Sequence, residues 1–245
     1  MNVFDKAIEF AVKAHGGMFR KGGATPYIVH PLEAAAIAAG FTDDPEILAA
    51  AVLHDTVEDT PYTYRDICEL FGRRVASLVA SDSEDKREDR PAEETWKIRK
   101  QETLDYLKTA PRDEKIVAFS DKLSNLRALH RDYLTVWEKV WDRFNQKDPQ
   151  EHLWYYGSFL DVCKELSDYP AYREYEKLFD EIASRVQEYL DYGFHGSHLK
   201  VISSPESGNW VLRDDVTSEV YTMTPDEFYA FLADYNKQSG EKENG

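Results

Sequence analysis

The chain has 245 residues, of which 42% are hydrophobic, and a formal net charge of −16 at pH 7. This composition supports one large domain, or a domain with an appendage, and excludes wholesale disorder. The acidic balance provides no basic footprint for a nucleic acid, so we expect no nucleic-acid partner.

Apolar residues at helical spacing predict that most of the chain is helical. The first predicted helix has four apolar side chains on one face: Phe4, Ile8, Ala11 and Val12. A loop over 16–29 follows, and a short helix begins at Pro31 and is closed by Gly40. The next helix begins with Asp44 as its N-cap and a proline at the first helical position, and it ends in His54-Asp55.

The remaining pattern changes from helices to strands near residue 191. Further helices are predicted over 63–71, 73–80, 95–109, 112–130, 133–145, 150–167 and 170–190. Short strands are predicted over 198–203, 209–213 and 218–222, before a last helix that begins at a capping box, Thr224 to Glu227. We therefore expect a mainly α fold, with a helical domain over 1–190 and a small α+β appendage over 191–245.

The most polar run, residues 81–95, lies between two predicted helices. It is typical of a solvated loop, and the alternative is a loop that covers a substrate.

Four residues in this order carry metal-binding side chains: His30, His54, Asp55 and Asp121. Asp121 follows an apolar run and should face inward, where a carboxylate without a partner is costly. Singly, a histidine before proline is typical of a helix start, and a buried aspartate of a cap or salt bridge. Together, two imidazoles and two carboxylates suit manganese, iron, zinc or a similar divalent ion.

Two further carboxylates, Glu58 and Asp59, come directly after His54-Asp55. On a helix or its last turn, Glu58 shares a face with His54 and Asp55. A metal lowers the pKa of its bound water to about 7, and a nearby carboxylate can orient that water and pass protons. The pair therefore predicts hydrolysis, and not metal binding alone.

Four sequence motifs carry a resemblance to a known family. They are Phe-Arg-Lys-Gly-Gly-Ala-Thr-Pro-Tyr-Ile-Val-His-Pro-Leu (19–32), His-Asp-Thr-Val-Glu-Asp-Thr (54–60), Phe-Gly-Arg-Arg-Val-Ala-Ser-Leu-Val (71–79) and Asp-Lys-Leu-Ser-Asn-Leu-Arg (121–127). In this order, over about residues 1–168, the chain resembles the HD-domain metal phosphohydrolases. Within them it is similar to the hydrolase domain of RelA/SpoT proteins, and most of all to the small alarmone hydrolases.

The resemblance implies an HD-type helical bundle and manganese as the metal, held by His30, His54, Asp55 and Asp121. It also implies that Glu58 and Asp59 act on the attacking water. The implied reaction removes the 3′-pyrophosphate from guanosine tetra- or pentaphosphate.

The resemblance also implies nucleotide contacts. Arg20 and Lys21 precede His30 on the loop, and Asn125 lies one helical turn beyond Asp121. Tyr155 is a candidate for a sugar or phosphate contact, with helix packing as the alternative.

Other basic residues have two interpretations. Arg99-Lys100 would either reach the pyrophosphate or form a solvated helix face. Lys122 and Arg127 are expected in surface or ion-pair roles.

Two rival functions stay open. One is an HD phosphohydrolase for another nucleotide, such as NADPH or a nucleoside phosphate, and the other is a non-catalytic nucleotide-binding module. The N-terminus lacks signal-peptide features and no apolar stretch is long enough for a bilayer, so we expect a cytoplasmic protein without a membrane partner. Cys68 and Cys163 are typical of core thiols in a reducing compartment. Homo-oligomerisation stays open.

Overall fold

The computed structural model describes residues 2–87, 89–191, 199–203, 208–214 and 217–231. The chain divides into two compact units, Met1–Asp180 and Glu181–Gly245. The first is helical, and the second contains a small antiparallel sheet, which confirms the predicted fold class. The division at 190/191 stays a prediction.

Short connections join most of the successive helices of the described residues, and two of these helices are of the 3-10 type (η). They are α1 (Val3–Ala14), α2 (Val29–Ala38), α3 (Pro45–Leu53), α4 (Thr56–Asp59), α5 (Tyr64–Phe71), α6 (Arg73–Asp82), α7 (Ala92–Leu107), α8 (Arg112–Val136), η1 (Trp137–Arg143), α9 (Pro149–Val162), η2 (Lys164–Leu166) and α10 (Pro170–Asp191). None of the described helices combines the length and the apolarity that a membrane span requires.

Local signals account for several helix ends. Asp44 caps α3 by accepting a hydrogen bond from the Glu46 amide at 2.9 Å. Thr63 and Asp66 form a capping box at the start of α5. Gly72, at a φ of +91°, separates α5 from α6 in a conformation that side chains rarely adopt.

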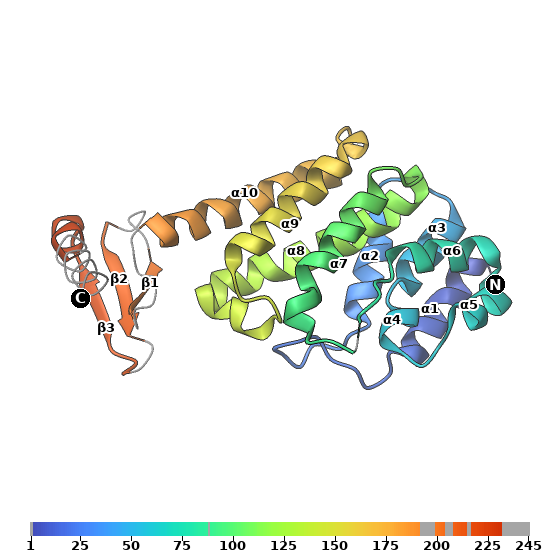
Figure 1. Ribbon diagram of the computed structural model, residues 1–245, viewed down its shortest axis with the longest axis horizontal. Coiled ribbons are helices and arrows are strands. Elements are labelled where there is room, and N and C mark those ends of the chain that lie inside the picture. The colour runs from blue at the N-terminus through green and yellow to red at the C-terminus, as the bar shows by residue number, and fades with distance from the viewer. Residues whose placement is uncertain (1, 88, 192–198, 204–207, 215–216, 232–245) are drawn as a thin grey trace. The chain divides into compact units, whose positions relative to one another are not determined.

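The longest helix, α8, forms the centre of the first unit. Helices α2, α3 and α6 pack against it (Figure 1). Phe119 of α8 is fully buried, and its ring centroid lies 5.2–6.1 Å from those of Phe41, Phe159, Tyr172 and Tyr175. This aromatic packing fixes the part of α8 that carries Asp121.

Two predictions about helices were wrong. The expected break after residue 130 is absent, because Leu129 and Tyr133 are both buried and continue the apolar stripe of α8 to Val136. The following Trp137–Arg143 form a 3-10 helix rather than an α-helix. In α1, Val12 is 49% exposed, whereas Ala7 and Ala11 are fully buried. The buried face of α1 is therefore turned away from Val12.

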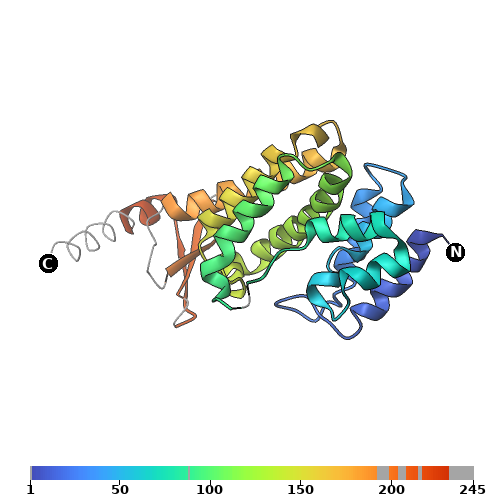
Figure 2. The ribbon, with the colours of Figure 1, turned by 45° about the vertical axis from the view of Figure 1, so that its right-hand side comes forward.

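The second unit contains the three predicted strands. They are β1 (Leu199–Ser203), β2 (Trp210–Asp214) and β3 (Val220–Met223), paired antiparallel in the order β1-β2-β3 (Figure 1). Figure 2 shows the same strands after a turn of 45°. The Thr224 amide donates to the Glu227 carboxylate at 2.9 Å, which starts the predicted helix over 225–231. The Trp210 and Phe228 rings stack with centroids 4.0 Å apart in the core of this unit.

Candidate metal centre

His54 and Asp55 lie at a break between two helices. Helix α3 ends at Leu53 and α4 begins at Thr56, so neither residue is inside a regular helix. Consecutive residues on a regular helix do not face each other. At this break the His54 Nε2 atom lies 3.0 Å from the Asp55 Oδ2 atom. The sequence predicted the two residues but not the break that turns both toward one point.

The candidate ligand atoms from three segments converge. His30 Nε2 lies 3.1 Å from His54 Nε2, 3.0 Å from Asp121 Oδ1 and 3.4 Å from Asp55 Oδ2. An ion about 2.1 Å from each ligand leaves neighbouring ligand atoms about 3.0 to 3.4 Å apart. His30, His54 and Asp121 are buried, so the site is shielded from bulk water. The arrangement of His30, His54 and Asp121 fits a divalent metal, and Asp55 Oδ2 lies within 3.4 Å of both imidazoles.

The hydrogen bonds of the two imidazoles fix their tautomers. His54 Nδ1 lies 2.8 Å from the Ala51 carbonyl oxygen, which only accepts, so the proton is on Nδ1. His30 Nδ1 lies 2.8 Å from Ser124 Oγ, whose own hydrogen goes to Glu33 Oε2 at 2.7 Å. With a proton on each Nδ1, both Nε2 atoms are directed at the same point, where a cation, either a shared proton or a metal ion, relieves the repulsion between them.

The electrostatics of the cluster favour positive charge. Burial opposes the charged form of His54, but the Asp55 and Asp121 carboxylates outweigh it and raise the pKa of His54 well above its ordinary value. Burial likewise opposes ionisation of Asp121, yet Lys122 and His54 hold the pKa of Asp121 well below its ordinary value. The site thus keeps its carboxylates ionised and attracts a cation.

Glu58 and Asp59 lie beside the metal centre. Burial and the Asp55 carboxylate raise the pKa of Glu58, while the Lys86 ammonium acts in the opposite direction. The Lys86 ammonium lies 2.8 Å from Asp59 Oδ1 and 3.1 Å from the Glu58 carbonyl oxygen. Lys86 was not among the sequence candidates, and its only sequence signal was a basic residue in an acidic run.

Tyr27 is a second residue that the sequence analysis missed. Its hydroxyl lies 2.6 Å from Asp55 Oδ2 and 2.9 Å from Asp59 Oδ2. Burial and the Asp55 charge raise the pKa of Tyr27, so the hydroxyl stays a donor. One hydrogen is thereby shared between a candidate metal ligand and a candidate proton-handling group. Its position three residues before His30, inside a motif already recognised, was the available signal.

The four predicted substrate contacts are placed differently. The Arg20 guanidinium donates to Asn125 Oδ1 at 2.7 Å, and Asn125 Nδ2 donates to Asp121 Oδ1 at 2.6 Å. Arg20 and Asn125 are therefore linked to the metal centre, whereas Lys21 is exposed on the loop. Tyr155 is buried, as the packing interpretation requires, but its hydroxyl has no hydrogen-bond partner among the described residues. Their contacts with a nucleotide stay predictions.

The polar run 81–95 is not simply a solvated loop. Its Glu84 side chain is only 11% exposed and pairs with Arg99 and Lys100 of α7. Those two residues are therefore not a solvated helix face. Lys122 is equally enclosed, at 12% exposed, in the ion-pair role that the sequence suggested.

A second layer of contacts holds His30 from behind. Glu33, which accepts from Ser124, also accepts from Arg127 Nη1 at 3.0 Å. Arg127 donates twice more to Glu174 of α10, each time at 2.7 Å. The orientation of His30 thus depends on contacts that reach α10.

The family model described as HD domain matches residues 7–148. This is more than half of the chain, and the chain belongs to the HD domain family. The predicted membership is confirmed.

Three similar proteins are named for their activity on guanosine polyphosphates. The guanosine-3′,5′-bis(diphosphate) 3′-pyrophosphohydrolase of Aquifex aeolicus is 40% identical over 126 residues, which are 51% of this chain and 17% of that protein. The enzyme of the same description, MESH1, from Danio rerio is 36% identical over 129 residues, 51% of this chain and 68% of the relative. The bifunctional (p)ppGpp synthase/hydrolase SpoT of Escherichia coli is 53% identical over 66 residues, 27% of this chain and 9% of that protein. The chain thus spans less than a fifth of the Aquifex and Escherichia proteins.

Two solved structures have a similar fold. A metazoan ortholog of SpoT that hydrolyses ppGpp superimposes with a TM-score of 0.57 at 23% identity, over 76% of this chain and 96% of that one. A Listeria monocytogenes protein superimposes with a TM-score of 0.54 at 32% identity, over 65% of this chain and 96% of that one. The helical bundle is therefore that of HD-domain proteins.

Proposed function

We propose that this chain is a metal-dependent hydrolase that removes the 3′-pyrophosphate from guanosine tetra- or pentaphosphate. The observation that carries the proposal is the convergence of two imidazole lone pairs and two carboxylate oxygens beside Glu58 and Asp59. The activity for which the Aquifex and Danio relatives are named supports the choice of substrate.

The residues have distinct roles in this proposal. His30, His54, Asp55 and Asp121 hold the ion, for which manganese is our choice because the resemblance to the RelA/SpoT hydrolase domain implies it and the mixed nitrogen and oxygen donors are compatible with it. A divalent ion held there supplies Lewis acidity and acidifies a coordinated water. Glu58, whose pKa is raised above its ordinary value, accepts and returns a proton, and Asp59 orients the attacking water.

The nucleotide is held by cations on one side of the metal centre. Arg20 is oriented by Asn125, and its guanidinium carbon lies 5.6 Å from the centroid of the Tyr27 ring. A guanidinium held this way is suited to stacking on a base or pairing with a phosphate. Lys21, exposed on the same loop, adds charge for the phosphates. We place Tyr155 at the phosphates.

We also propose that the protein acts in the cytoplasm, within the stringent response. The two cysteines are free, as expected in a reducing compartment. The Aquifex and Escherichia relatives are named for hydrolysis of the substrate that we propose here.

The test is turnover by purified full-length protein loaded with manganese. It should release pyrophosphate from guanosine tetraphosphate, and Glu58→Gln should lose more than about 100-fold in kcat while still binding the metal. Arg65→Gln is a matched control, because Arg65 lies at the surface and forms an ion pair with Glu69. Preference for NADPH or a nucleoside monophosphate in a substrate panel would reject the alarmone and keep the hydrolase. Absence of turnover on every substrate would reject both.

A further inference from the structure

Three cations meet one carboxylate beside the metal centre. Glu84 Oε1 accepts from the Lys100 ammonium at 2.6 Å, and Glu84 Oε2 accepts from the Arg99 guanidinium at 2.8 Å. The charge of Lys122 also acts on Glu84, and together the three cations hold the pKa of Glu84 below its ordinary value against the effect of burial. We call Arg99, Lys100 and Lys122 the cation cluster.

The cation cluster is enclosed rather than solvated. The side chains of Arg99, Lys100 and Lys122 are 11%, 18% and 12% exposed. Surface lysines normally keep their ammonium groups in water. Bringing three cations together out of water costs free energy, which an anion between them offsets. The cluster therefore needs an anionic occupant.

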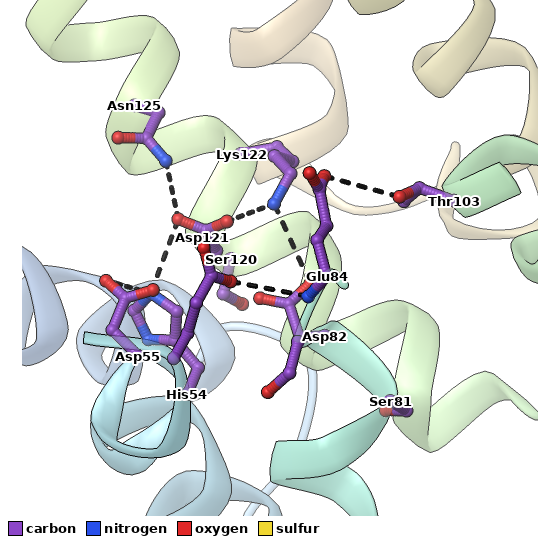
Figure 3. Close-up of polar contacts among 12 residues, drawn as sticks. His54, Asp55, Ser81, Asp82, Glu84, Thr103, Ser120, Asp121, Lys122 and Asn125 are labelled. Carbon is purple, nitrogen blue, oxygen red and sulfur yellow. Dashed lines mark hydrogen bonds and ion pairs between the residues drawn. The ribbon is translucent and has the colours of Figure 1, made fainter. Parts of the chain in front are cut away.

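The cation cluster borders the residues of the proposed reaction. The Lys122 ammonium forms an ion pair with the candidate ligand Asp121 and lies 3.7 Å from Asp82 (Figure 3). The Glu84 amide lies 3.4 Å from the Glu58 carboxylate. Glu84 also lines a cavity of about 470 Å³ with Arg99 and Thr103, so space is present beside the cation cluster.

An unused hydrogen-bond donor lies in the same place. Tyr155 is 3% exposed, and its hydroxyl has no hydrogen-bond partner among the described residues. The Lys100 ammonium lies 5.0 Å from the centroid of its ring. Burial raises the pKa of Tyr155, so the hydroxyl keeps its proton and can donate. A buried hydroxyl without a partner is uncommon and points to a ligand with more acceptor oxygens than Glu84 has.

The segment that delivers Glu84 is held mainly by side chains. Residues 83–87 join α6 to α7 without regular secondary structure. Its links to the helices include the ion pairs of Glu84, Lys86 and Arg87, the 3.1 Å contact of the Lys86 ammonium with the Glu58 carbonyl oxygen, and hydrogen bonds of Ser83 to the end of α6. An anion of higher charge can exchange with Glu84, because it keeps the enclosed cations neutralised when that carboxylate leaves.

We propose that the cation cluster, with the Tyr155 hydroxyl, is the subsite for the pyrophosphate group, and that Glu84 occupies it when no phosphate is bound. Pyrophosphate has more charge and more acceptor oxygens than one carboxylate, and it displaces Glu84 together with residues 83–87. When Glu84 returns, it competes with the product and speeds its release. The inference deepens the proposed function, since it names the place of the group that is removed.

The test is calorimetric titration of inorganic pyrophosphate into the chelator-treated full chain. Glu84→Gln keeps the shape of the side chain and removes the competing charge, so we expect pyrophosphate to bind about tenfold more tightly. Adding Lys100→Gln to Glu84→Gln should reverse that gain. Glu94→Gln is the matched control, because Glu94 lies exposed on α7, the helix that carries Lys100, and pairs with Arg90. It should leave the affinity unchanged.

Hydrogen exchange provides the second measurement. Pyrophosphate should speed amide exchange in residues 83–87 of the unmodified chain as Glu84 leaves the cluster. Unchanged or weaker pyrophosphate binding by Glu84→Gln would overturn the proposal, as would binding with no change in exchange over 83–87. Neither measurement depends on turnover. A failure of the proposed alarmone hydrolysis can therefore be distinguished from a failure of the proposed pyrophosphate subsite.

Discussion

The hydroxyl of Tyr27 should be necessary for full metal affinity and activity. Tyr27→Phe removes one oxygen and keeps the ring, whose centroid lies 5.0 Å from that of His15 and 6.0 Å from that of His30. The lost hydroxyl donates toward Asp55 at 2.6 Å and Asp59 at 2.9 Å. A hydrogen bond to a charged group contributes about 1.5–3 kcal/mol, which corresponds to roughly 10- to 150-fold in an equilibrium or rate.

We therefore expect Tyr27→Phe to weaken manganese binding about tenfold, and to lower kcat/KM by about 10- to 100-fold. Metal affinity is measured by calorimetry, and activity by pyrophosphate release at saturating manganese. Tyr64→Phe is the control, because the Tyr64 hydroxyl is exposed and makes a long contact of 3.4 Å with Ser77 Oγ. If Tyr27→Phe stays within twofold of the unmodified chain in both assays, the bridge does not position the two carboxylates and the reasoning is wrong.

Three further predictions concern the stability and chemistry of the first unit. Phe119→Ala should cost about 3–5 kcal/mol of unfolding free energy in a urea titration, whereas Phe19→Ala, at a ring 59% exposed, should cost less than about 0.5 kcal/mol. Burial raises the pKa of Asp82 from 3.8 to about 6. Between about pH 3.8 and pH 6 the folded chain then binds more protons than the unfolded chain, so the free energy of unfolding falls as the pH rises through this range. Asp82→Asn should lack that fall when unfolding is followed at several pH values, and a parallel pH dependence would contradict the assignment. Burial raises the pKa of the Cys163 thiol to about 12, so a thiol reagent should label half-buried Cys68 and spare Cys163 until the chain unfolds; equal rates would refute this.

The features that the sequence predicted are those that local chemistry decides. The Asp44 cap and the Thr224 capping box each satisfy amides within a few residues, so the pattern is complete in the sequence. The convergence of His30, His54 and Asp121 was predictable because the motifs that carry them resemble those of a known family, whereas their role as metal ligands together with Asp55 stays a prediction.

The features that were missed depend on contacts between distant residues. Tyr27 reaches Asp55 across 28 positions, and Lys86 reaches Asp59 across 27. The acidic run that contains Glu84 has the composition of an exposed loop, and cations of α7 and α8 give it buried partners. Likewise α8 continues past residue 130 because neighbouring helices cover Leu129 and Tyr133. A local pattern does not contain those partners.

The contact between Arg127 and Glu174 bears on where this catalytic unit ends. The match to the HD domain model ends at residue 148, yet Glu174 accepts two of the three hydrogen bonds that Arg127 donates to carboxylates among the described residues. Tyr172 and Tyr175 likewise cover Phe119 from beyond that limit. A chain trimmed to residues 7–148 would keep all four proposed ligands and lose part of the contacts that orient His30. We therefore expect the smallest active piece to extend to about residue 180, where the first compact unit ends.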